Sequence, residues 1–336
     1  MVRYSIAHCN FTITGRVKAS GFLAVLPCFC TGIVYKRKVY EVMKADTYLS
    51  HCYAIPETPS VLPLADEAFA SVWKESEGVA AREFLAEIVG RDIASFPLRQ
   101  EETLRIFFAK TLGGRLPVIV PGNRDDFLRV EALLNGREDL ADFPVTVNAF
   151  TMQARAKNIR NHRVILLGQA PYSNVPANLL GFDEEEWIER SCRLRFAHEC
   201  AHYETLRLFG GMQNHALDEI VADAMGQLAV FGNFSAARQR LFFGLEQGTG
   251  RCTGRLSFYC RNVLPWERTE VYRAVDATLG ILEGRIERFL TEKKRKTETK
   301  ELLSSAKTLL SDKKSKYELL SDLAGTSIAE RYKALL

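Results

Sequence analysis

The sequence predicts an α+β fold, because long helical patterns follow a few short strand patterns along its 336 residues. Helical spacing of apolar residues continues over 183–209 and over 215–231, with Gly210 and Gly211 between the two runs. Strand patterns cover 145–151, where apolar and polar residues alternate, and 163–168, which is almost continuously apolar. We therefore expect a small sheet packed on a pair of long helices.

The N-terminal segment, residues 1–60, is expected to be rich in strands, with a role that the sequence leaves open. Residues 21–35 form an apolar run without charge, flanked by Lys18 and by Lys36. The run is shorter than the roughly 20 residues of a membrane span, and Pro27 interrupts it. No small-residue cleavage site follows it, so we expect buried strands and neither a membrane span nor a signal peptide.

Residues 61–245 are expected to form the core of the protein, and helices in 246–290 to complete it. Helical patterns cover 64–90 and 99–112, and a short apolar strand lies at 117–121 between two prolines.

The most informative motif is His198-Glu199-Cys200-Ala201-His202, in the middle of the helical run 183–209. Two histidines four residues apart lie on one face of a helix, where they can bind the same metal ion. Glu199 projects beside that ion. Cys200 is turned away from the pair and is expected to be a buried apolar thiol.

The second helical run offers a third ligand. Asn214 is a candidate N-cap, and Glu219 and Asp223 lie four residues apart on one face. If the two helices pack antiparallel across the Gly210-Gly211 turn, both carboxylates come opposite the two histidines.

The motif followed by the run 218–226 resembles the thermolysin-like gluzincin metallopeptidases, a match of about 40 residues. The resemblance implies one zinc ion per chain, bound by His198, His202 and Glu219, with Asp223 hydrogen bonded to His198. It also implies a zincin-like core: a small mixed sheet packed on the two metal-site helices, here with a helical C-terminal extension. Glu199 would be the catalytic base.

The resemblance extends to a possible substrate strand and leaves one role open. Asn148-Ala149-Phe150 is similar to the substrate-binding edge strand of thermolysin, so Asn148 and Ala149 are expected to contact substrate through backbone pairing. Thermolysin stabilises its transition state with a histidine downstream of the glutamate ligand, whereas none of the six histidines here lies beyond Glu219. The candidates for this catalytic role are His215 and Tyr259, with Tyr272 and Arg255 as further donors.

The predicted function is zinc-dependent hydrolysis of peptide bonds, with a peptide or protein as substrate. Two alternatives stay open: a zinc hydrolase that acts on another substrate, and a zincin-fold scaffold or binding protein without activity. Substrate preference depends on the shape of the cleft, which the motif does not determine.

Charge and cysteine content add weaker expectations. The net charge of +4 arises in residues 291–336, where 11 Lys and Arg face 7 Asp and Glu. We expect this basic segment to be a charged helical tail with a solvated face, open to contact with a partner. Eight cysteines without a C-x-x-C pair suggest reduced thiols and a cytoplasmic protein. No motif predicts binding of nucleic acid, nucleotide or calcium.

Overall fold

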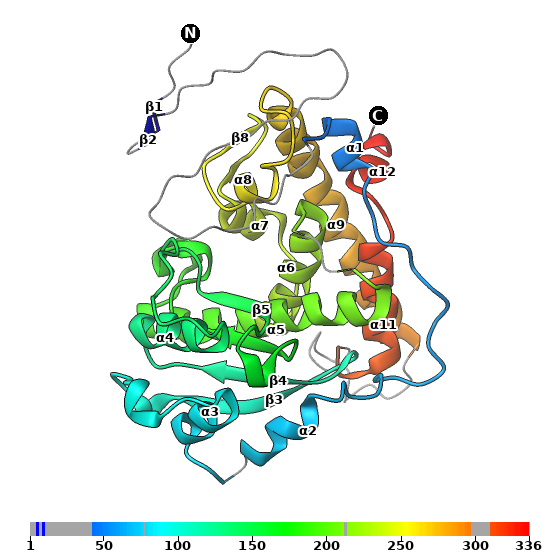
Figure 1. Cartoon of the computed structure of the whole chain (residues 1–336). Helices are drawn as coiled ribbons and strands as arrows, with labels where there is room; N and C mark the ends of the chain where they lie inside the picture. Colours follow the sequence, from blue (N-terminus) through cyan, green and yellow to red (C-terminus); the bar gives the residue numbers. More distant parts are fainter. Residues whose placement is uncertain are drawn as a thin grey trace, which may run out of the picture.

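The computed structural model describes residues 5–6, 9–10, 42–76, 78–211, 214–296 and 310–335. Within them the fold is α+β, as predicted: a small sheet lies beside a larger group of helices (Figure 1). The apolar run 21–35, predicted to form strands, lies outside the described residues. No helix in the described ranges has both the length and the apolar character needed to cross a bilayer.

The main sheet has four strands in the order β3-β4-β6-β5. Strands β3 (Arg105–Thr111) and β4 (Gly114–Val120) form an antiparallel hairpin, β6 (Arg163–Leu167) runs parallel to β4, and β5 (Ala149–Gln153) is an antiparallel edge strand. The prediction of a helix over 99–112 is wrong, because 105–111 pair with β4. Gly114, with φ of 102°, makes the tight turn that the hairpin requires.

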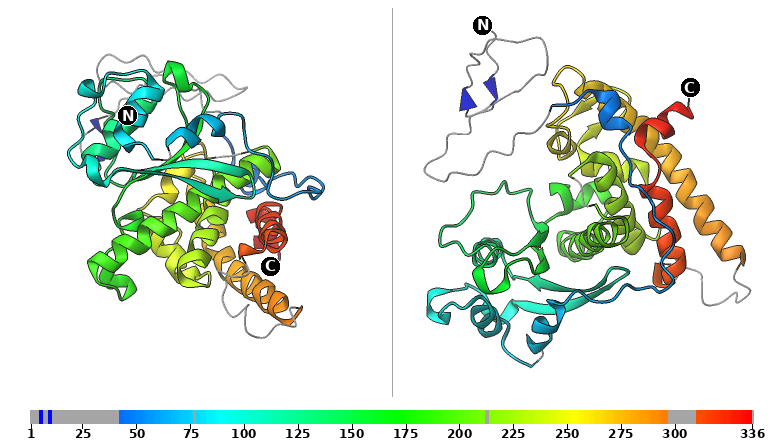
Figure 2. Two further views of the ribbon diagram at one scale, coloured as in Figure 1. Left: turned by 90° about the horizontal axis from the view of Figure 1, so that it is seen from below. Right: turned by 45° about the vertical axis from the view of Figure 1, so that its right-hand side comes forward.

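Both faces of the sheet are covered by helices, as the left view of Figure 2 illustrates. Helices α3 (Ala81–Val89) and α4 (Arg124–Leu134) pack on one face, where Ile119 of β4 is buried. Helix α5 (Glu184–Phe209) packs on the other face, against Val118 and Ile165. Burial on both faces explains the nearly continuous apolar sequence of β4 and β6.

The largest core lies among the helices on the far side of α5. Its members are α1 (Ala45–Leu49), α6 (Ala216–Phe231), α7 (Ala236–Phe243), α8 (Leu256–Tyr259), α9 (Arg268–Lys296), α11 (Lys313–Ala324) and α12 (Ile328–Lys333). Helix α11 buries Leu319, Leu320 and Leu323 in this core. Lys313 and Lys314 of the same helix are exposed, so α11 has both a buried and a solvated side.

The other elements are short. The helical pattern at 64–90 corresponds to two separate helices, α2 (Ala70–Trp73) and α3. The remaining strands are β1 (Ser5–Ile6), β2 (Cys9–Asn10), β7 (Leu245–Glu246) and β8 (Arg251–Cys252).

Candidate metal centre

Helix α5 carries the two histidines and is capped at both ends by its own sequence. The Asp183 side chain accepts a hydrogen bond from the Glu186 backbone N–H, and three glutamates follow in the first turn. Gly210 ends the helix in the left-handed conformation, with φ of 75°. These bounds confirm the helix predicted over 183–209 and place His198, Glu199 and His202 in its buried middle.

Helix α6 crosses α5 closely. Its N-cap is His215 and not the predicted Asn214, because His215 Nδ1 accepts a hydrogen bond from the Leu217 backbone N–H. Gly226 allows the close contact: a Cβ atom there would lie 3.0 Å from both Leu194 Cδ2 and the Leu194 carbonyl oxygen on α5. The crossing brings Glu219 and Asp223 opposite the two histidines.

Three buried side chains converge at this crossing: His198, His202 and Glu219. The two Nε2 atoms lie 2.9 Å apart, and the Glu219 oxygens lie 3.6 Å from His198 Nε2 and 3.5 Å from His202 Nε2. Their ligand atoms all lie within 4.8 Å of one another. The group could hold a metal ion, and among the described residues no other set of three His, Cys, Asp or Glu side chains has this arrangement.

The orientation of the imidazoles fits a cation. His198 Nδ1 lies 2.8 Å from Asp223 Oδ1, and a carboxylate oxygen only accepts hydrogen bonds, so the proton belongs on Nδ1. The lone pair of His198 Nε2 then points towards His202 and Glu219. Lone pairs that face one another inside a protein repel unless a proton or a cation lies between them, and a divalent ion suits this donor set.

Several residues support His198. The Tyr172 hydroxyl lies 2.9 Å from His198 Nδ1 and donates to Asp223 Oδ1 at 2.5 Å. Gln239 Nε2 donates to Asp223 Oδ2 at 2.5 Å, and Arg255 forms an ion pair with the same carboxylate. Burial raises the pKa of Asp223, but Arg255 and His198 outweigh burial and hold it well below its usual range. Sequence reasoning missed Tyr172 and Gln239, which lie on other elements.

His202 is supported by a carboxylate that sequence reasoning also missed. Asp218 Oδ2 lies 3.3 Å from His202 Nδ1, within ion-pair distance, although the ring N–H is not aligned for a hydrogen bond. Burial lowers the pKa of His202, but Asp218 and Glu219 outweigh it and raise that pKa well above its usual value. The signal available in the sequence was the position of Asp218, directly before the candidate ligand Glu219.

Glu199 faces the sheet. Its Oε2 accepts a hydrogen bond of 2.7 Å from the Thr151 hydroxyl, whose oxygen also lies 2.9 Å from the Glu199 backbone carbonyl oxygen. Thr151 belongs to the edge strand β5, so this strand lies directly beside the histidine motif. Thr151 is within the strand predicted at 145–151, but nothing in its spacing indicated the contact.

The other two substrate-side predictions fall on or next to β5. Asn148 is buried. Its Nδ2 donates to Val145 O at 2.7 Å, and its Oδ1 accepts from Arg124 Nη1 at 3.3 Å. Its carbonyl accepts from Gly168 N, which makes 148 and 168 a hydrogen-bonded pair. Because such pairs alternate along antiparallel strands, the N–H and C=O groups of Ala149 and Thr151 point away from β6, towards the free edge.

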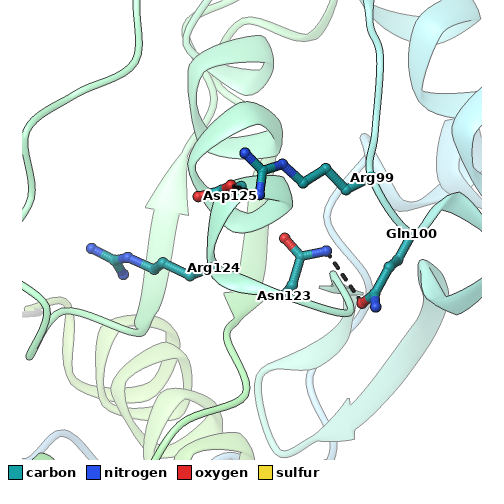
Figure 3. Close-up of a pocket in the computed structure, with 5 residues that line it drawn as sticks. All are labelled: Arg99, Gln100, Asn123, Arg124 and Asp125. Carbon is teal, nitrogen blue, oxygen red and sulfur yellow. Dashed lines mark hydrogen bonds and ion pairs between the residues drawn. The ribbon is translucent and has the colours of Figure 1, made fainter.

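Arg124 holds the segment that leads into β5. Its guanidinium donates to Phe143 O and Pro144 O, each at 3.2 Å, and reaches away from Asn123 and Gln100 (Figure 3). The pocket shown there, at the start of α4, has a volume of about 410 Å³. Within its lining, Arg99 pairs with Asp125 at 2.6 Å and Asn123 Nδ2 donates to Gln100 Oε1 at 3.2 Å.

The four candidate donors differ in position. His215 Nε2 lies 2.9 Å from Tyr48 O, so both ring nitrogens take part in hydrogen bonds of the fold. Tyr272 is buried in the large helical core. Burial of Tyr259, with a contribution from the charge of Glu219, raises the pKa of its hydroxyl well above the usual value. Arg255 Nη1 lies 3.5 Å from Glu219 Oε2.

A family model matches residues 146–313, half of the chain. The chain belongs to this family. It is described as a family of unknown function (DUF7005). No curated protein and no solved structure matches the chain. The matched residues include β5, α5, α6 and α8, so every side chain of the histidine and glutamate group lies within the family region.

Proposed function

We propose that this protein is a zinc-dependent hydrolase of peptide bonds with a gluzincin-like, zincin-type centre. The observation that carries this proposal is the buried convergence of His198, His202 and Glu219 with Glu199 beside them, its carboxylate outside the ligand group. Two His and one Glu are the ligand set of catalytic zinc in several peptidases, where a fourth position stays open.

The distances fit zinc. Ligand atoms bound tetrahedrally at zinc distances lie about 3.3 Å from one another. Here the two Nε2 atoms lie 2.9 Å apart, Glu219 Oε1 lies 3.5 Å from His202 Nε2, and Glu219 Oε2 lies 3.6 Å from His198 Nε2. His198, His202 and Glu219 would hold the ion, and Asp223 and Asp218 would orient the two imidazoles.

Bound zinc would supply a Lewis acid that makes water more acidic and polarises a carbonyl group. Glu199 takes a proton from the attacking water and delivers it to the leaving amine as the C–N bond breaks. The hydrogen bond from Thr151 fixes the orientation of the Glu199 carboxylate for this transfer.

Tyr259 is the best-placed donor for the developing oxyanion. Burial and the charge of Glu219 raise its pKa, so the hydroxyl is protonated at neutral pH. A neutral hydroxyl can donate to the carbonyl oxygen as negative charge forms on it. Arg255 is already paired with Asp223 and Glu219, which suits a positioning role.

A peptide is the preferred substrate class because of strand β5. The backbone groups of Ala149 and Thr151 point to the free edge, and Thr151 also touches Glu199. An extended peptide that pairs with this edge as an added strand would therefore run past the catalytic carboxylate.

The test combines zinc content with activity. Elemental mass spectrometry of the purified protein should give close to one zinc per chain, and Glu199→Gln should keep the zinc but lose hydrolysis of a mixed pool of casein-derived peptides. Glu189→Gln, an exposed glutamate on the same helix, is the matched control and should behave as wild type. A protein without zinc, even after reconstitution, contradicts the proposal. A zinc protein that turns over esters but no peptide would favour the non-peptide alternative.

A further inference from the structure

Tyr53 connects a distant part of the chain to the metal centre. Its hydroxyl donates to Asp218 Oδ1, across 165 positions of sequence. The other oxygen of Asp218 lies 3.3 Å from His202 Nδ1. All three side chains are buried. The Tyr53 hydroxyl and the Asp218 carboxylate therefore connect the helical core to the candidate ligand His202.

We propose that Tyr53 is a positioning residue that fixes Asp218 and thereby the imidazole of His202, and so sets how tightly the centre binds its metal. This role rests on the proposed metal site. The Asp218 carboxylate can rotate, and only one orientation of its plane places one oxygen beside His202 Nδ1 and the other beside the Tyr53 hydroxyl. The Tyr53 hydroxyl engages the opposite oxygen and selects that orientation. Groups that orient ligand imidazoles affect metal affinity strongly.

Helix α11 holds Tyr53 in place. The Tyr53 backbone N–H donates to Ala324 O at 3.0 Å, at the last residue of α11. The Tyr53 ring lies 6.0 Å from the ring of Phe209 on α5, which in turn lies 6.1 Å from the ring of Tyr317 on α11. Figure 2 (right) shows the extended segment after α1 running along α11.

Helix α11 is itself fixed to the metal helix. Lys316 Nζ lies 2.5 Å from Glu204 Oε1, two residues beyond His202, and Glu204 is fully buried. The same Oε1 accepts a hydrogen bond from Leu112 N at 2.8 Å. Helix α11 is therefore linked to the centre by two routes, through Tyr53 to Asp218 and through Lys316 to Glu204 of α5.

The experiment measures zinc affinity by competition with a chromophoric chelator. Tyr53→Phe should weaken zinc binding by about tenfold, the lower end of the range for residues that support metal ligands. Tyr317→Phe is the matched control: it also removes one hydroxyl bonded to this segment, at Pro56 O, but has no contact with Asp218. Its affinity should equal that of wild type. The absorption bands of the cobalt-substituted protein should shift in Tyr53→Phe alone.

A double-mutant cycle separates positioning from a general loss of stability. In an Asp218→Asn background, Tyr53→Phe should change zinc affinity little further, because the carboxylate it orients is gone. Equal losses in Tyr53→Phe and Tyr317→Phe, or full additivity with Asp218→Asn, would overturn the role of Tyr53 while leaving the zinc site intact. A wild-type protein that binds no zinc would overturn both this role and the proposed function.

Discussion

Asp223 Oδ1 lies 2.8 Å from His198 Nδ1, which joins helix α6 to helix α5 at the centre of the candidate site. The same oxygen accepts a hydrogen bond from Tyr172, and the other oxygen is bonded by Gln239 and Arg255. A fully satisfied carboxylate of this kind has one orientation. It therefore fixes the proton on His198 Nδ1 and the direction of the Nε2 lone pair.

Removal of the Tyr172 hydroxyl should weaken metal binding. Tyr172→Phe takes one of the donors from Asp223, so the His198 imidazole loses part of its orientation, and zinc affinity should fall by about tenfold. Tyr203→Phe is the control, since it removes a buried hydroxyl bonded to Glu67 from the same helix that carries the histidines. Chelator competition on both variants gives the comparison. Equal affinities in the two would show that the hydroxyl of Tyr172 does not support the centre.

Tyr259→Phe should distinguish between the candidate donors. If Tyr259 stabilises the oxyanion, its loss should lower kcat by about 100-fold, with little change in KM or zinc content. His215→Asn should leave kcat near the wild-type value, because His215 is engaged by Leu217 N and Tyr48 O. Steady-state kinetics on the casein-derived peptides that wild type cleaves would test both. The reverse result, a large loss in His215→Asn alone, would assign the role to His215.

Acid should destabilise the protein through His215. Burial, with a contribution from His51, lowers the pKa of His215 from 6.5 to about 3 in the folded state. The folded protein therefore favours the neutral ring. Its contribution to stability is complete above about pH 6.5 and is lost as pH falls from there towards 3.

The measurement is the free energy of unfolding in urea at pH 7 and pH 5. Between these values wild type should lose about 2 kcal/mol more than His215→Asn, which keeps an N-cap side chain but has no titrating ring. Equal losses of unfolding free energy in the two proteins would exclude His215 as the source of the acid sensitivity.

The sequence was sufficient to predict the helix pair that carries the candidate ligands. It was not sufficient to predict the side chains that surround them. The caps at Asp183 and Gly210 and the four-residue spacings define α5 and the residues that α6 presents to it. Tyr53 and Tyr172 approach from other segments, and only the packed fold brings them to Asp218 and Asp223. Contacts of this kind leave no local pattern, because side chains from distant segments need no particular spacing.

One error in the predicted elements, and one buried surface that was not predicted, have physical causes. Residues 99–112 have apolar positions that also satisfy helical spacing, but pairing with β4 across the Gly113-Gly114 turn decides their conformation. In α11, the charge of three lysines indicated a solvated face and gave no sign that the leucines of this helix are buried. Lys316 is compatible with burial of this helix because it pairs with Glu204, a partner 112 positions away.

Gly226 should be required for the distance between α5 and α6. In Gly226→Ala the new methyl group would lie 3.0 Å from both Leu194 Cδ2 and Leu194 O, so we expect α5 and α6 to shift apart by a few tenths of an ångström, at a cost of about 1–3 kcal/mol in unfolding free energy. The separation would move Glu219 away from the histidines, so zinc affinity should also fall.

Gly280→Ala is the matched control for this change. Gly280 also lies within a helix, α9, but a Cβ atom there meets nothing within 4 Å. Alanine should therefore stabilise the protein, by up to about 1 kcal/mol, and leave zinc affinity unchanged, because only the backbone preference for helix is altered. Urea unfolding and chelator competition on both variants separate the two effects. A stable Gly226→Ala protein with wild-type zinc affinity would show that α5 and α6 can move apart without disturbing the ligands.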